Sequence, residues 1–346
     1  MSDNVLKIGV IGLGIGEQHI NACIEMPSVE VATICDHNVD KMNTIGDKNQ
    51  INSRVSDWRD IISNQEINVV TIASHDNNHA EQVISALENG KHVFVEKPIC
   101  LSMEELTNIQ SELNNHPELR FSSNLPLRTC PRFKKLRNVI RKKDMGEVYH
   151  IEADYLWGRP EKLVHGWRRD IPLYSIVLGA SIHMIDLFIW LTGEFPTEVV
   201  GYGSKKALGQ NHCNFDDFAV NLFRFTNGAI VKVSAHGGGA HPHHHNVRVY
   251  GTEKNFFHDI NGAYWVDSRS PDAVPRVELS DYPARELRGR VLRSFLANII
   301  NPAQAPLVSC SDALSTMKIA LAADHAIRDE KVQPIVIDQV GTQVET

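Results

Sequence analysis

The sequence predicts a two-domain α/β protein, in which a parallel sheet with helices precedes an α+β domain built on an antiparallel or mixed sheet. The 346 residues exceed what one hydrophobic core usually supports, and 42% of them are apolar. Early in the chain, β-branched runs alternate with amphipathic stretches, as in parallel β-α-β units. Beyond Phe121 the strand-like runs instead meet at hairpin turns. We therefore expect two domains, residues 1–123 and 124–346.

Four strands and two helices are predicted from local patterns in the first domain. The strands are Leu6–Ile11, Val29–Cys35, Val69–Ala73 and His92–Val95. A helix from Ser102 to about Asn114 begins with a capping box, because Glu105 follows Ser102 by three residues. An earlier helix, from about Asn78 to Glu88, ends near Gly90, which suits a C-terminal cap.

Two hairpins, a buried helix and a C-terminal helix are predicted in the second domain. The hairpin strands are Asp217–Phe225 with Ala229–Ala235, and Asn255–Asp259 with Ala263–Val266. The apolar window Ile176–Leu191 contains His183 and Asp186, which would be costly in hydrocarbon. It therefore predicts a buried helix and no membrane span. A helical pattern from Asp312 to Arg328 closes the chain.

Charge and cysteine usage restrict the possible partners and the compartment. The formal net charge is -7, so no basic excess is present to neutralise nucleic-acid phosphates or anionic lipids. Nucleic acid and membrane are therefore excluded as expected partners. The six cysteines are far apart and form no Cys-x-x-Cys pair, which favours a reducing, cytoplasmic location.

A glycine-rich turn follows the first predicted strand directly. Gly12, Gly14 and Gly16 surround Leu13 and Ile15 at the start of a predicted helix, where a dinucleotide fold holds the pyrophosphate. The usual G-x-G-x-x-G spacing would place the third glycine at position 17, so this turn is shorter or shaped differently. Such glycines can also form a purely structural turn. The pattern predicts a Rossmann dinucleotide-binding domain.

An acidic residue, Asp36, ends the second predicted strand. A carboxylate at this position can accept hydrogen bonds from the adenosine ribose hydroxyls, and it would repel a 2′-phosphate. The alternative is that Asp36 only caps the following turn. We expect NAD as the cofactor in preference to NADP.

Motifs along most of the chain resemble the Gfo/Idh/MocA family of oxidoreductases. The motifs are Glu96-Lys97-Pro98, the glycine turn followed by His19, the segments 74–79 and 90–93, and the later segments 225–229 and 250–253. Their common order is more specific than any single match. The resemblance implies an N-terminal Rossmann domain and a C-terminal domain with an open, largely antiparallel sheet that commonly serves oligomer contacts.

The resemblance also implies which residues bind the cofactor. They are Gly12, Gly14, Ile15, Gly16, Asp36, Ser74, His75, Asn77, His79, Glu96 and Lys97. Lys97 would lie between nicotinamide and substrate, with Pro98 restricting its conformation. Without these motifs, Lys97 would be interpreted as a solvated surface lysine.

The second domain is expected to supply the catalytic partner His183. Family members usually carry Asp-x-Gly-x-His at this point, and His183 and Asp186 fit the pattern. Gly179 replaces the aspartate and Ser181 replaces the glycine, so the carboxylate is missing. The alternative for His183 is a satisfied core histidine.

A histidine-rich stretch is predicted to form a loop after a hairpin strand. It contains His236, His241, His243, His244 and His245 around three glycines. A solvated loop, a substrate-binding loop and a metal site all remain open. We expect no metal and name His241 and His243 as substrate candidates.

Three polar residues resemble active-site positions of the family and are further substrate candidates. They are Asn124, Arg128 and Arg168. Arginine suits a carboxylate or phosphate through a two-point contact, although residues of these types more often lie at a surface or domain interface.

The function that these patterns favour is NAD-dependent hydride transfer at a secondary alcohol or ketone of a sugar, nucleotide sugar or cyclitol. A non-enzymatic dinucleotide sensor or regulatory subunit is the alternative, because a fold alone does not establish turnover. A metal-dependent hydrolase is a third hypothesis. We expect a homo-oligomer, either a dimer or a tetramer.

Overall fold

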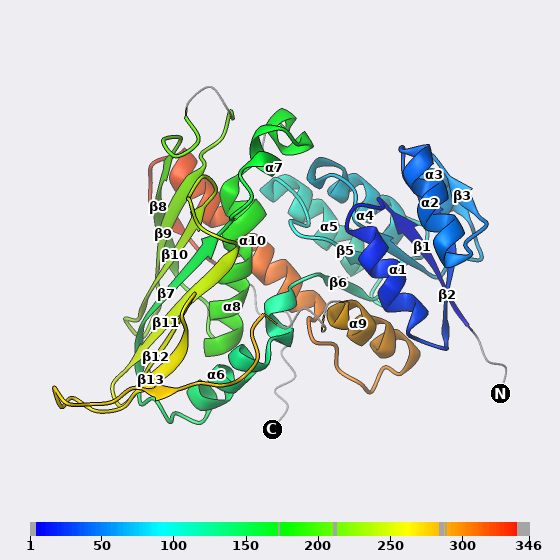
Figure 1. Ribbon diagram of the computed structural model, residues 1–346. Coiled ribbons are helices and arrows are strands. Elements are labelled where there is room, and N and C mark those ends of the chain that lie inside the picture. Colours follow the sequence, from blue (N-terminus) through cyan, green and yellow to red (C-terminus); the bar gives the residue numbers. More distant parts are fainter. Residues whose placement is uncertain (1–4, 172–173, 210–212, 284–286, 288, 338–346) are drawn as a thin grey trace. The chain divides into compact units, whose positions relative to one another are not determined.

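A computed structural model describes residues 5–171, 174–209, 213–283, 287 and 289–337. The chain forms two compact units (Figure 1), the first from residues 1–129 and 285–314 and the second from residues 130–284 and 315–346. The chain thus returns to the first unit after building most of the second. The predicted division at residue 123 instead assigns residues 285–314 to the second domain.

The first unit is built on a parallel sheet with the strand order β3-β2-β1-β4-β5-β6. Its strands are β1 (Leu6–Ile11), β2 (Val29–Cys35), β3 (Arg54–Val55), β4 (Val69–Ile72), β5 (His92–Val95) and β6 (Phe121–Ser123). This is the doubly wound order of dinucleotide-binding folds, and it reverses between β1 and β4. The carboxyl ends of these two strands therefore mark where a ligand would bind.

Helices α1 (Gly16–Ile24), α2 (Val39–Asn49), α3 (Trp58–Ser63), η1 (Asp76–Asn78), α4 (His79–Glu88) and α5 (Met103–Asn115) connect these strands. The unit also contains η2 (Pro126–Thr129) and α9 (Arg290–Ile300), which follow the last strand. The predicted strands β1, β2 and β5 are confirmed at both ends. The capping box of α5 is confirmed, because the Glu105 N–H donates to Ser102 Oγ at 3.1 Å and Glu105 Oε2 accepts from the Ser102 N–H at 3.2 Å.

The second unit contains a mixed, mostly antiparallel sheet with the order β14-β13-β12-β11-β7-β10-β9-β8-β15 among the described residues. The strands are β7 (Val148–Leu156), β8 (Glu198–Ser204), β9 (Phe218–Arg224), β10 (Ile230–His236), β11 (His244–Gly251), β12 (Asn255–Asp259), β13 (Gly262–Val266), β14 (Arg276–Val277) and β15 (Gln333–Pro334). Both predicted hairpins, β9–β10 and β12–β13, are confirmed. Strands β7 and β10 pair in parallel.

Helices line one face of this sheet, and the other face is open (Figure 1). The helices of the unit are α6 (Pro131–Arg141), α7 (Glu161–Val164), η3 (Trp167–Asp170), η4 (Val177–Ser181), α8 (Ile182–Thr192) and most of α10 (Cys310–Arg328). Residues alternate along β7, so Ile151, Ala153 and Tyr155 are buried on the helix-covered face.

The apolar window near residue 180 forms a helix with a change of pitch. The segment η4 is a π-helix, and it continues directly into α8. Most of α8 is buried, but His183 is only partly buried. Insertions of this kind often occur at functional sites, because they redirect the side chains that follow. No helix among the described residues is long and apolar enough to cross a membrane.

Candidate active site

The glycine turn after β1 packs against the turn after β4. Gly12 has a φ of 82°, and a Cβ on it would lie only 2.5 Å from the carbonyl oxygen of Ala73. Gly14 is different, because the nearest atom to an added Cβ would be Lys41 Nζ at 3.9 Å. The turn therefore leaves open space at Gly14, directly before α1 begins at Gly16. A pyrophosphate fits this arrangement of exposed backbone and helix N-terminus.

Asp36, the predicted ribose-binding residue, also holds the glycine turn in place. Its carboxylate accepts from the Leu13 N–H at 2.7 Å and from the Asn38 N–H at 2.9 Å, and Lys41 Nζ lies 3.3 Å away. Burial opposes ionisation of this carboxyl, but the two N–H groups and the Lys41 ammonium together lower the pKa of Asp36. The carboxylate is thus charged and already oriented towards the turn.

The turn after β4 contributes both exposed and buried residues among the predicted cofactor ligands. His75 and Asn77 are exposed, whereas His79 is fully buried. His79 Nδ1 lies 2.6 Å from the carbonyl oxygen of Pro98, and its Nε2 lies 3.3 Å from that of Ser74. His79 therefore joins the turns after β4 and β5. This placement favours a positioning role over direct contact with a ligand.

Glu96 anchors the segment that carries Lys97. Its Oε1 lies 3.0 Å from His19 Nε2 and accepts from Asn124 Nδ2 at 2.7 Å. Burial alone would raise the pKa of Glu96, but the contacts with His19 and Asn124 and the charge of Lys97 lower it. From Val93 to Leu101 every residue is buried except Lys97. The segment thus presents one side chain, the lysine, from an otherwise buried support.

In the second unit, His183 stacks on Tyr155 of β7. The ring centroids are 5.5 Å apart and the planes differ by 11°. Tyr155 also contacts His243 at 5.2 Å and His245 at 5.0 Å. Burial raises the pKa of Tyr155 to about 12, against the opposing charges of Arg159 and Arg168. Tyr155 was not among the predicted site residues. The alternation of apolar and polar residues along β7 could have indicated that Tyr155 is buried, but not that it contacts His183.

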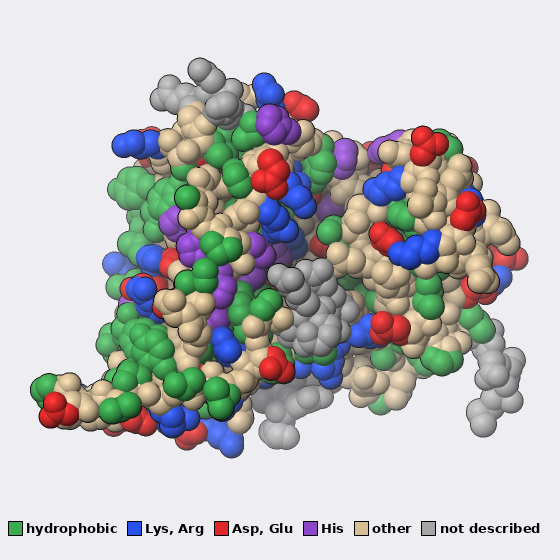
Figure 2. Space-filling view, in the orientation of Figure 1, with side chains coloured by type: hydrophobic (Ala, Val, Ile, Leu, Met, Phe, Trp, Pro, Cys, Tyr) green, Lys and Arg blue, Asp and Glu red, His purple; other side chains and the backbone are tan. Residues whose placement is uncertain are grey.

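The histidine-rich stretch is only partly a loop. His236 ends β10, and His244 and His245 begin β11, so the prediction of one continuous loop is wrong for these three residues. Regular pairing with β9 and β7 extends the strands into the stretch. Figure 2 shows histidine side chains gathered over β10 and β11. No group of three or more His, Cys, Asp or Glu among the described residues is placed to hold a metal ion.

The histidines of this stretch have different partners. His243 Nδ1 lies 3.1 Å from the Leu156 carbonyl oxygen, and His245 Nδ1 lies 2.5 Å from the Tyr282 hydroxyl. His241 Nδ1 contacts the carbonyl of the neighbouring Pro242 at 2.7 Å. Desolvation lowers the pKa of both His243 and His245. Both rings are therefore neutral at pH 7. A neutral imidazole can accept a hydrogen bond from a hydroxyl group at one nitrogen and donate one at the other.

The two predicted arginines have different surroundings. Arg128 is buried in the first unit, where its Nη1 lies 3.0 Å from Asp312 Oδ2 and 3.4 Å from the Leu307 carbonyl. This placement favours a structural role, because it fixes the returning segment 285–314. Arg168 is half-buried in the second unit, with its guanidinium 4.2 Å from the centre of the Trp167 ring.

The space that the side chain of the missing family aspartate would enter is occupied by another residue. A Cβ added to Gly179 would overlap the hydroxyl of Tyr174 and lie 2.9 Å from Tyr174 Cζ. The tyrosine ring thus occupies the volume that an aspartate side chain would enter. Any side chain at position 179 would therefore require the Tyr174 ring to move.

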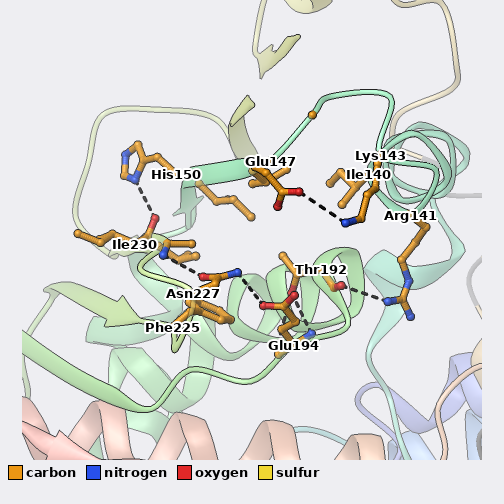
Figure 3. Close-up of a pocket in the computed structure, with 15 residues that line it drawn as sticks. Ile140, Arg141, Lys143, Glu147, His150, Thr192, Glu194, Phe225, Asn227 and Ile230 are labelled. Carbon is orange, nitrogen blue, oxygen red and sulfur yellow. Dashed lines mark hydrogen bonds and ion pairs between the residues drawn. The ribbon is translucent and has the colours of Figure 1, made fainter. Parts of the chain in front are cut away.

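A cavity of about 200 Å³ lies elsewhere in the second unit, beside the end of α8 and the β9–β10 turn (Figure 3). Its polar side chains pair locally. Asn227 Nδ2 donates to Glu194 Oε2 at 3.0 Å, Arg141 donates to the Thr192 carbonyl, and Lys143 lies 3.5 Å from Glu147. Several polar groups that line the cavity thus already contact one another.

Two family models match this chain. Residues 6–122 match the oxidoreductase family with an NAD-binding Rossmann fold, and residues 133–257 match the GFO/IDH/MocA C-terminal domain. A similar curated protein is myo-inositol 2-dehydrogenase of Thermotoga maritima, with 24% identity over 94% of this chain and 97% of that protein.

Solved structures share the fold over nearly the whole chain. Myo-inositol 2-dehydrogenase from Lactobacillus plantarum has a TM-score of 0.81 at 22% identity, covering 96% of this chain and 99% of that one. Levoglucosan dehydrogenase in complex with NADH and levoglucosan has a TM-score of 0.83 at 21% identity, covering 96% and 100%. With both family models matched in order, the chain belongs to the Gfo/Idh/MocA family of oxidoreductases, whose first domain is an NAD-binding Rossmann fold.

Proposed function

We propose that this protein is a dehydrogenase that transfers hydride between NAD and a secondary alcohol or ketone of a sugar, nucleotide sugar or cyclitol. The observation that carries the proposal is the presentation of two reactive side chains. Lys97 and His183 are each partly accessible within an otherwise buried segment. Lys97 belongs to the first unit and His183 to the second. The names of the relatives, inositol and levoglucosan dehydrogenases, support this substrate class.

Each residue has a role that follows from its chemistry. NAD, which takes up or releases the hydride, supplies the redox chemistry when bound. His183 accepts the proton of the substrate hydroxyl, because histidine titrates near neutral pH. The Lys97 ammonium stabilises the negative charge that develops on the reacting oxygen. Glu96 and Tyr155 are positioning residues, since they hold the lysine segment and the histidine ring respectively.

A panel of substrates tests this function directly. NADH formation should be measured for the purified protein with polyols, cyclitols, aldoses and nucleotide sugars, and NADH consumption with the corresponding ketones. At least one compound should give sustained turnover. The retained Lys97 and His183 favour the enzyme, whereas the missing aspartate of the Asp-x-Gly-x-His motif gives some weight to the alternative, a dinucleotide sensor. Tight NADH binding without turnover on the whole panel would support that alternative.

Cofactor preference provides a separate prediction. The wild type should bind NADH more tightly than NADPH, because the Asp36 carboxylate repels a 2′-phosphate. Replacing Asp36 with Ser and His37 with Arg should shift the preference towards NADPH. NADH affinity should fall as well, since Asp36 also holds the Leu13 N–H. Fluorescence titration with both cofactors measures these changes.

The matched control for this variant is Asp40→Ser, which removes an exposed carboxylate at the start of α2. It should leave the ratio of the two dissociation constants unchanged. Equal affinities of the wild type for NADH and NADPH would contradict the role assigned to Asp36.

The open face of the sheet is the proposed place of self-association into a dimer or tetramer. Tyr202, Leu222 and Ile230 are 72%, 46% and 43% exposed on the neighbouring strands β8, β9 and β10. Burying such apolar side chains favours association. Leu222→Glu should lower the molar mass measured by light scattering, whereas Lys142→Glu, at an exposed position directly after α6, should not. A wild-type protein that is monomeric at micromolar concentration would contradict the proposal.

A further inference from the structure

We propose that the substrate carries an anionic group, a carboxylate or a phosphate, which is bound by Arg159 and Arg168. This inference rests on the proposed dehydrogenase function and narrows its substrate class. Both arginines follow β7 in the chain, and both guanidinium groups lie over the same indole ring. The distances to the centre of the Trp157 ring are 5.8 Å for Arg159 and 5.7 Å for Arg168.

The aromatic support orients two cations without neutralising them. Trp157 is itself fixed, because it is 4% exposed and its Nε1 donates to the Arg159 carbonyl at 2.9 Å. Arg168 also stacks on Trp167 at 4.2 Å. Stacking on indole rings restricts the motion of a guanidinium while leaving its N–H groups free to bind an anion.

Neither arginine forms an ion pair with a carboxylate in the part of the chain that the structure describes. Arginines elsewhere do, for example Arg128 with Asp312 and Arg248 with Glu152. The Nε of Arg159 is buried and has no hydrogen-bond partner among the described atoms. A buried donor without a partner is costly. A bound anion would supply that partner and would compensate the positive charge of the guanidinium groups.

The arginines lie close to the histidine assigned to catalysis. Both of their charges act on the hydroxyl of Tyr155, the ring on which His183 stacks. The charge of Arg159 also acts on His243 and His245, which contact the same tyrosine. An anion held by the two arginines would therefore place the rest of its molecule beside His183. The neutral imidazoles of His243 and His245 can then bind hydroxyl groups of that molecule.

The chemistry of the pair identifies the ligand class. A guanidinium presents N–H groups in a planar fork, which matches two oxygens of a carboxylate or phosphate. A neutral polyol does not compensate two positive charges. The substrate class favoured by this site is therefore a sugar acid, or a phosphorylated sugar or cyclitol.

Matched pairs of ligands test the inference by binding alone. Calorimetry in the presence of saturating NADH should compare D-glucuronate with D-glucose, and myo-inositol 1-phosphate with myo-inositol. At least one anionic member should bind about 10- to 100-fold more tightly than its neutral partner, the range for charge-assisted hydrogen bonds. The difference should decrease as salt is added, because exposed charge pairs are screened. The two pairs distinguish a carboxylate from a phosphate.

Three variants locate the effect. Arg159→Met and Arg168→Met should each lower the affinity for the anion by about 10-fold or more and leave the neutral ligand nearly unchanged. Arg168→Lys should retain part of the affinity, since it keeps the charge and loses the fork. The control is Arg169→Met, which also removes one positive charge, but from the exposed residue that follows Arg168. NADH affinity should be unchanged in every variant.

The outcomes separate this inference from the proposed function. Equal binding of anionic and neutral members, no binding of either anion, or an equal effect of Arg169→Met would overturn the anion site. Turnover of a neutral polyol without any preference for anions would keep the dehydrogenase and reject the anion site. Arginine-dependent binding of an anion on a protein that shows no hydride transfer would keep the anion site and reject the dehydrogenase.

Discussion

Replacing His183 with Asn is expected to lower turnover by about 10²- to 10⁴-fold, the usual contribution of a general acid–base group. Asparagine keeps the polar character of the position but does not titrate. The NADH dissociation constant should be unchanged, because we assign His183 to the proton of the substrate and not to cofactor binding. Steady-state kinetics and NADH fluorescence measure the two quantities separately.

The control for this variant is His150→Asn on β7. His150 lies on the open face of the sheet, opposite to Tyr155, and its Nδ1 contacts the Ile230 carbonyl at 2.8 Å. This variant should keep near-normal turnover. If His183→Asn also does so, the histidine has no part in proton transfer. Tyr155 would be a poor replacement as a base, because burial raises its pKa to about 12.

The fold was predictable where local sequence signals act alone. The ends of β1 and β5 follow from β-branched residues bounded by turn residues, and the start of α5 follows from its Ser102–Glu105 capping box. The return of residues 285–314 to the first unit has no such signal. It depends on contacts distant in sequence, such as Ser122 Oγ to the Val308 carbonyl at 2.8 Å and the ion pair of Arg128 with Asp312.

Candidate site residues could be named from the sequence where a motif marks them, and not where strand pairing brings residues together. Lys97 and His183 were predicted from motifs, and both are accessible in otherwise buried segments. Tyr155 comes close to His245, 90 residues later in the chain, only because β7 pairs with β11. No local pattern encodes that register. The same limit applies to Arg159, whose Nε is buried without a hydrogen-bond partner among the described atoms.

Changing Lys97 to Met is expected to reduce turnover at least as much as changing His183, by 10²-fold or more. Methionine has a similar length but no charge, so it cannot supply the compensation that we propose the Lys97 ammonium gives to the reacting oxygen. Glu96 should remain held by His19 and Asn124, so the fold around the position should persist. Steady-state kinetics give the loss, and thermal unfolding checks the fold. The exposed lysine variant Lys48→Met should retain wild-type turnover.

Combining Lys97→Met with His183→Asn tests whether the two residues act on the same step. If the ammonium stabilises the oxyanion that forms as His183 takes the proton, either single change already removes most of the benefit. The double variant should then lose less than the product of the two single losses, as for groups that act as a unit. A loss equal to that product would assign the residues to independent contributions. Normal turnover in Lys97→Met would exclude the lysine from catalysis and leave it the role of a cofactor contact, which NADH titration of the same variant would detect.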